Sequence, residues 1–226
     1  MTAMTPVANA SVNVRAAFIA KTYVHLFGAI ALFTLLEIGL FMTGLAEPIA
    51  TTMLSGSWLL VLGAFMVVGW LFSSVAARAK SLPAQYAALL GYIVAEALIF
   101  VPMLYLADMY APGAISSAAL VTLLGFAGLT TVAITSRKDF SFMGATLKWI
   151  GVGAILLIVG SLVFGFHLGT WFSVAMVVFA GGVILYDTSN VLHRYPRDRY
   201  VSASLSLFAG VALMFWYVLR IFMGRR

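Results

Sequence analysis

Runs of about 20 apolar residues recur along this chain, and each is long enough to cross about 30 Å of hydrocarbon as an α-helix. A transmembrane β-barrel would instead show short segments in which apolar and polar residues alternate. Charged residues make up 9% of the chain, against roughly 25% in soluble domains. The sequence therefore predicts an all-α membrane protein with seven transmembrane helices, at residues 22–43, 57–77, 84–107, 113–135, 143–165, 169–192 and 202–223.

The connections between these runs are too short to separate two domains, so we expect one transmembrane domain at residues 17–226 after a cytoplasmic tail at residues 1–16. Short loops rich in Lys and Arg stay in the cytoplasm. Every second connection is basic and the alternate connections hold no Lys or Arg, which predicts a cytoplasmic N-terminus and an outside C-terminus in a cell inner membrane. The residues on the basic side are Arg15, Lys21, Arg78, Lys80, Arg137, Lys138, Lys148, Arg194, Arg197 and Arg199, and the exceptions are Arg220, Arg225 and Arg226.

Several kinds of chemistry are disfavoured by the composition. The chain has no Cys and three scattered His, so neither a thiol nucleophile nor a transition-metal site is expected. It also lacks the GxSxG and HExxH motifs of hydrolases and metalloproteases. The net charge of +6 is spread over separate loops, which favours contact with lipid headgroups over nucleic acid. We expect a membrane protein that is not an enzyme and needs no cofactor.

Ionisable side chains at membrane depth are costly and usually face the interior of a helix bundle. Glu96 lies halfway along the third predicted span and is either an ion-path carboxylate or a hydrogen-bonded structural acid. Asp187, near the cytoplasmic end of the sixth span, lies at a depth similar to that of Arg78 in the second. The two side chains form either a structural ion pair or part of an ion gate.

Other polar positions favour structural roles. Glu37, in the outer part of the first span, is expected to reach the interface, and His25 is expected to be structural. Ser202, Ser206 and Gly210 recur every four residues along one face of the seventh span. Small residues let helices approach closely in lipid, so this stripe is either a helix-packing face or a polar pore lining.

Four stretches together resemble the Bax inhibitor-1 family, the transmembrane Bax inhibitor motif proteins, in its bacterial branch. The resemblance extends from about residue 18 to residue 222. The stretches are FIAKTYV at 18–24, TSRKDFSFMG at 135–144, ILYDT at 184–188 and VLRIF at 218–222.

This resemblance implies a fold in which the seventh helix is enclosed by the other six, and a proton-sensitive calcium leak. It also implies an aspartate pair between the sixth and seventh helices, with an arginine of the second helix competing for it. Asp187 matches the first aspartate and Arg78 the arginine, whereas Gly210 occupies the place of the second aspartate. A lone Asp187 beside Arg78 favours an ionised pair over two carboxyl groups that share a proton.

Two functions follow as hypotheses. The first is an ion-leak or channel-like protein that passes calcium or another cation and responds to pH. The alternative is a non-conducting modulator of another membrane protein, such as a membrane quality-control protease.

The charge distribution makes a prediction about topology. A reporter fused after Lys138 should report the cytoplasm, and one fused after Gly113 should report the outside, because the basic connections stay inside. Paired fusions to alkaline phosphatase and a fluorescent protein measure this, and the opposite pattern would refute the orientation.

Overall fold

The computed structural model describes residues 6–56, 63, 69, 71, 72, 74, 75, 79, 81–136 and 138–224. Most of the second predicted span, at residues 57–77, lies outside the described residues, as does Arg78. The described positions within that span all have helical backbone, and they are Gly63, Gly69, Leu71, Phe72, Ser74 and Val75. The presence of seven transmembrane helices and the enclosure of the seventh therefore stay predictions.

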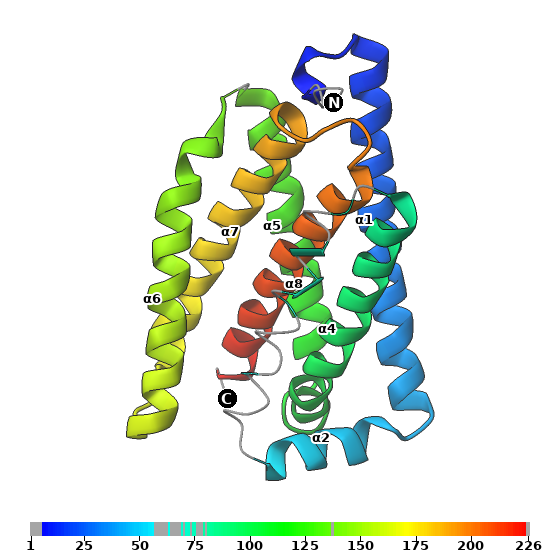
Figure 1. Ribbon diagram of the computed structural model, residues 1–226. Helices are drawn as coiled ribbons and strands as arrows, with labels where there is room; N and C mark the ends of the chain where they lie inside the picture. Colours follow the sequence, from blue (N-terminus) through cyan, green and yellow to red (C-terminus); the bar gives the residue numbers. More distant parts are fainter. Residues whose placement is uncertain are drawn as a thin grey trace. The chain divides into compact units, whose positions relative to one another are not determined.

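Six of the described helices are long and apolar enough to cross a membrane, and they correspond to the six other predicted spans (Figure 1). They are α1 (Val12–Met42), α4 (Leu82–Tyr110), α5 (Ala114–Ser136), α6 (Met143–Phe164), α7 (Gly169–His193) and α8 (Tyr200–Met223). The described residues form no β-strand apart from an isolated bridge between Pro6 and Pro196. The all-helical fold class is thus confirmed for the described part of the chain.

Two segments are more structured than the sequence suggested. The first helix begins at Val12 rather than at residue 22. It is preceded by a short 3-10 helix, η1 (Val7–Asn9), in which the backbone N–H of Val7 donates to the carbonyl of Tyr195 over 2.9 Å. The connection after α1 contains a further helix, α2 (Ala46–Ser55). The predicted N-terminal tail is therefore held in part by hydrogen bonding, and the first connection is not a plain loop.

Two of the turns between helices contain a glycine whose backbone has the left-handed conformation. Gly165 caps the C-terminus of α6 with a φ of 72°, and Gly113 has a φ of 80° between α4 and α5. This backbone region is open to glycine at little cost, because glycine has no Cβ to clash with the carbonyl oxygen. A short connection can therefore reverse the chain at each point.

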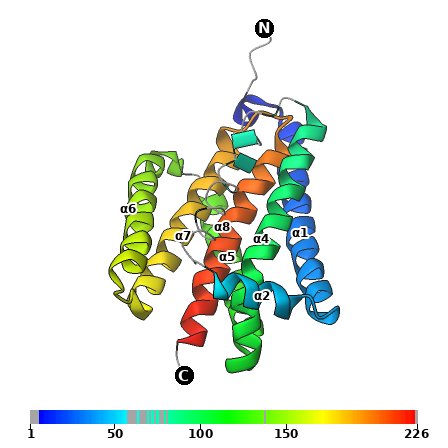
Figure 2. The ribbon, with the colours of Figure 1, turned by 60° about the horizontal axis from the view of Figure 1, so that its bottom comes forward.

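The described chain forms two compact units. The first comprises Met1–Pro102 and Ser189–Ala209, and the second comprises Met103–Thr188 and Gly210–Arg226. In the first unit, α2 lies across the C-terminal end of α1 (Figure 2). Its buried residues, Ala46 and Ala50, are four positions apart and so share one helix face.

Gln85 joins α4 to the start of α8 within the first unit. Its side chain is 1% exposed. The amide nitrogen donates to the carbonyl of Asp198 over 3.1 Å, and the amide oxygen accepts from the backbone N–H of Ser202 over 3.3 Å. The first N–H groups of a helix have no partner within the helix. The side chain of Gln85, on a neighbouring helix, therefore supplies a hydrogen-bond partner for a backbone N–H at the start of α8.

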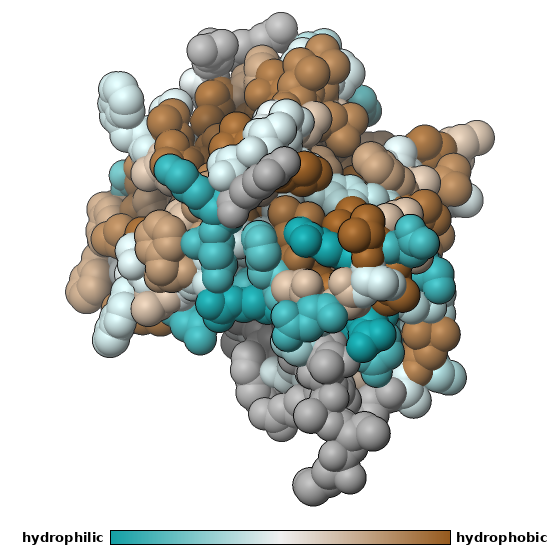
Figure 3. Space-filling model, turned by 90° about the horizontal axis from the view of Figure 1, so that it is seen from above, coloured by the Kyte–Doolittle hydropathy of each residue, from teal (hydrophilic) through white to brown (hydrophobic). Residues whose placement is uncertain are grey.

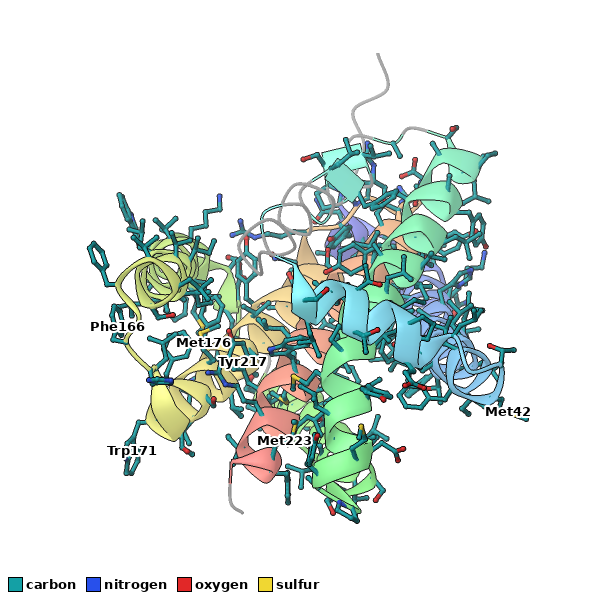
Figure 4. All side chains as sticks on the ribbon, turned by 90° about the horizontal axis from the view of Figure 1, so that it is seen from below. Met42, Phe166, Trp171, Met176, Tyr217 and Met223 are labelled. Atoms are coloured by element: carbon teal, nitrogen blue, oxygen red, sulfur yellow. The ribbon has the colours of Figure 1, made fainter. Side chains whose placement is uncertain are left out.

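In the second unit, a small apolar cluster joins three helices. Ala154 of α6, Met176 of α7 and Tyr217 of α8 are buried together, and Met176 and Tyr217 lie next to each other in Figure 4. Trp171, at the start of α7, is 86% exposed and points away from the helices in the same view. Exposed aromatic side chains near helix ends are typical of the membrane–water interface.

The exposed surface is apolar over much of the helices and polar at one end. Large exposed side chains include Trp149 on α6 and Phe164 at its end, which are 77% and 81% exposed. An apolar surface of this extent fits contact with lipid. Hydrophilic side chains gather on the face shown in Figure 3.

The hydrogen bonds of Gln85 make a prediction about stability. Gln85→Leu removes both hydrogen bonds of the buried side-chain amide, each of which contributes about 0.5–1.5 kcal/mol, so we expect earlier thermal unfolding in detergent. Leu90→Ala, at a position on the same helix that is 49% exposed, is the control and should change the unfolding temperature little. Equal unfolding temperatures for Gln85→Leu and wild type would show that these bonds do not stabilise the start of α8.

Candidate functional site

A polar cluster lies in the first unit, between the N-terminal half of α1 and the N-terminal ends of α4 and α8. His25 Nδ1 is 2.7 Å from the carbonyl oxygen of Lys21, and His25 Nε2 is 2.6 Å from the hydroxyl of Tyr86. A carbonyl only accepts, so Nδ1 carries a proton. Nε2 of a neutral imidazole then accepts from the Tyr86 hydroxyl. His25 thus has partners at both nitrogens, as expected for a structural histidine.

Tyr200, the first residue of α8, completes this cluster. Its ring centroid lies 5.1 Å from that of His25, and the Lys21 ammonium nitrogen lies 5.3 Å from the centroid of the Tyr200 ring. An ammonium group over an aromatic face is attracted by the ring quadrupole. Lys21 therefore keeps a favourable contact at the point where α1, α4 and α8 meet.

An aromatic layer follows toward the C-terminal ends of the same helices. Phe33 of α1 contacts Phe100 of α4 edge-to-face at a centroid distance of 5.2 Å, and it contacts Phe208 of α8 at 6.1 Å. Tyr92 of α4 also contacts Phe208 at 6.1 Å. Edge-to-face pairs of this kind add to the free energy of apolar burial. The layer separates the polar cluster from the C-terminal part of α1.

Glu96 borders this aromatic layer. It is half-buried and lies on the same face of α4 as Tyr92 and Phe100, one helical turn from each. The Glu96 carboxyl group and the Tyr92 hydroxyl share a hydrogen bond. Glu96 therefore has one polar neighbour within its own helix, in surroundings that are otherwise aromatic.

The stripe of small residues on α8 makes contacts of two kinds. The backbone N–H of Ser202 donates to Gln85, and the hydroxyl of Ser206 lies 2.9 Å from that of Tyr195. At Gly210, in the second unit, a Cβ would lie 3.1 Å from Cγ1 of Ile184 on α7. Each of these contacts is with the chain itself, as a helix-packing face requires.

Asp187 lies half-buried on α7, three residues after Ile184 and so close to it on one helix face. Its proposed partner Arg78 is outside the described residues, and the Asp187–Arg78 pair therefore stays a prediction. Among the described residues, no group of three or more His, Asp or Glu side chains is arranged to hold a metal ion.

Glu37 does not lie where its sequence position suggested. It is 6% exposed, and within the described part of the chain neither carboxyl oxygen has a hydrogen-bond partner. Its position near the end of α1 gave its depth but not the direction of its side chain. The expectation that Glu37 reaches the interface was therefore wrong.

Comparison with known proteins agrees with the quoted motifs. A family model described as "Inhibitor of apoptosis-promoting Bax1" matches residues 15–226. The chain is 29% identical over 223 residues to the "Golgi anti-apoptotic protein" of vaccinia virus (strain Lister), covering 95% of this chain and 88% of that protein. It is 30% identical over 224 residues to "Bax inhibitor 1" of Schizosaccharomyces pombe, covering 96% and 80%.

Bacterial membrane proteins are also similar to it. An "Uncharacterized membrane protein" of Vibrio cholerae is 37% identical over 128 residues, covering 53% of this chain and 55% of that protein. Together with the apolar helices, these matches establish what the motifs suggested: the chain is a multi-pass membrane protein and belongs to the Bax inhibitor-1 family.

Proposed function

We propose that this protein is a non-enzymatic cation leak of a bacterial inner membrane, with its N-terminus in the cytoplasm, and that calcium is the ion to test first. The observation that carries the proposal is Glu96, a carboxyl group halfway along a transmembrane helix that shares a hydrogen bond with Tyr92 of the same helix. A charge at this depth is costly, and polar side chains there commonly mark ion pathways. Family membership supports the same function.

The aromatic layer gives a reason for the leak to be slow. A cation crossing the hydrocarbon needs oxygen ligands in place of its water. Glu96 supplies such oxygens on α4, whereas Phe33, Phe100 and Phe208 supply none. Passage then requires these rings to move apart, so the described state corresponds to a closed path.

A second function is favoured by α6. In the span that contains this helix, Phe140–Phe164, 11% of an apolar stretch of 18 residues is buried, the smallest share among the candidate spans of the described residues. An apolar helix with so few internal contacts offers a surface to another membrane protein, such as a quality-control protease. Reconstitution separates the two functions: flux from the pure protein supports a leak, and a stable co-purifying membrane protein without flux supports a modulator.

The role of Glu96 can be tested directly. If Glu96 stabilises the passing cation, Glu96→Gln removes its charge, and a loss of about 1.4 kcal/mol slows transfer about tenfold. Calcium and potassium flux into liposomes measures this, with Asp108→Asn, an exposed position on the same helix, as control. Unchanged flux together with a lower unfolding temperature would return Glu96 to a structural role.

The resemblance also makes a prediction about Gly210. Gly210→Asp places a second carboxyl on the α8 face that packs on Ile184, near Asp187. Two close carboxyl groups share a proton because both do not ionise cheaply. Flux should then acquire a dependence on pH in the weakly acidic range.

The control for this variant is Gly210→Ala, which adds the same Cβ beside Ile184 without the charge. Flux against pH is measured for wild type and both variants. A steep pH dependence that is already present in wild type and equal in all three proteins would show that the aspartate position does not govern the response.

A further inference from the structure

Glu37 is an ionisable side chain that the proposed leak does not use. It lies on the buried face of α1, four residues after Phe33, and its two carboxyl oxygens have no hydrogen-bond partner within the described residues. An isolated carboxylate in apolar surroundings is very costly, and such a group normally keeps its proton. The question is whether any nearby group supplies a compensating charge.

The sequence rules out a cationic partner over a long stretch around Glu37. Residues 22–77 contain no Lys or Arg, and residues 57–77 contain no Asp, Glu, Lys, Arg, His or Tyr. The second predicted span therefore supplies no charged counter-ion to Glu37. α2, which packs on α1, carries Glu47, which is exposed and acidic.

Among the described helices of the first unit, α4 and α8 also contact α1. Within this unit the two helices carry four titratable side chains, and neither carboxyl oxygen of Glu37 has a hydrogen bond with any of them. They are Tyr86, Tyr92, Glu96 and Tyr200.

The position of Glu37 also indicates from which side a proton arrives. Toward the N-terminal end of α1, the aromatic contacts of Phe33 with Phe100 and Phe208 separate Glu37 from the cluster at His25. Toward the other end, Glu37 is five residues from Met42, or about 7.5 Å along the helix. Met42 is 82% exposed. The short route to the protein surface therefore runs toward the C-terminal end of α1, after which α2 begins.

We propose that Glu37 is a proton-binding site near the C-terminal end of α1, occupied while its side chain is buried and emptied when the side chain reaches water. The proton is the ligand, and the neutral carboxyl group is the form that the packed state accommodates. Loss of the proton leaves a buried anion without a partner, which only water or a cation relieves. The proposal does not depend on the leak, because it concerns a bound proton and not a passing ion.

Infrared spectroscopy tests the protonation state directly. A protonated carboxyl group has a carbonyl stretch above the amide region, and an ionised one does not. We expect the difference spectrum of wild type minus Glu37→Gln, taken on the full chain in lipid at neutral pH, to contain this band. Wild type minus Glu47→Gln should contain a carboxylate band instead, because Glu47 is exposed to solvent.

Thermal unfolding supplies an independent readout. If the folded protein holds one more proton than the unfolded chain, its stability falls as pH rises. As pH rises above the ordinary range of a free carboxyl group, about pH 4 to 5, wild type should lose unfolding temperature relative to Glu37→Gln. Glu47→Gln should follow wild type. The absence of the protonated band, or parallel pH curves for wild type and Glu37→Gln, would overturn the proposal.

Discussion

The cost of placing polar groups in hydrocarbon governs this structure. Backbone groups have no water to bond with in the bilayer, so each segment satisfies them internally as a helix. The same cost applies to side chains and explains where polar contacts occur. His25 has partners at both ring nitrogens, and Gln85 uses both ends of its amide. In the first unit these bonds also hold helices together that apolar contact alone would not align in lipid.

An aromatic layer divides the polar side chains of the first unit into two groups. Phe33, Phe100 and Phe208 fill the space between three helices with rings that offer no ligand to an ion or a proton. Polar groups on its two sides are therefore independent of each other while the layer is closed. The His25 cluster belongs to the N-terminal side, and Glu37 belongs to the C-terminal side.

The sequence predicted the helices well and their side-chain contacts poorly, for a physical reason. Hydropathy measures the free energy of a whole segment in lipid, so the starts of five helices were predicted within two residues. The early start of α1 was not predicted because the segment around Arg15 is polar and so does not belong to the apolar run. The Gln85–Ser202 contact joins residues 117 positions apart, and no local pattern carries such information. Glu37 was misjudged because depth along a helix does not specify which face is buried.

The two carboxyl groups Glu37 and Glu96 differ in one contact, and this difference separates their chemistry. Glu96 shares a hydrogen bond with Tyr92, which offsets part of the cost of a charge. Glu37 has no such partner in the described residues, so a proton is the least costly way to remove its charge. In the proposed leak, a cation at Glu96 meets a group able to carry charge, whereas a cation at Glu37 must first displace a proton. The two proposals therefore concern separable events within one unit, and we expect a substitution at either position to leave the other intact.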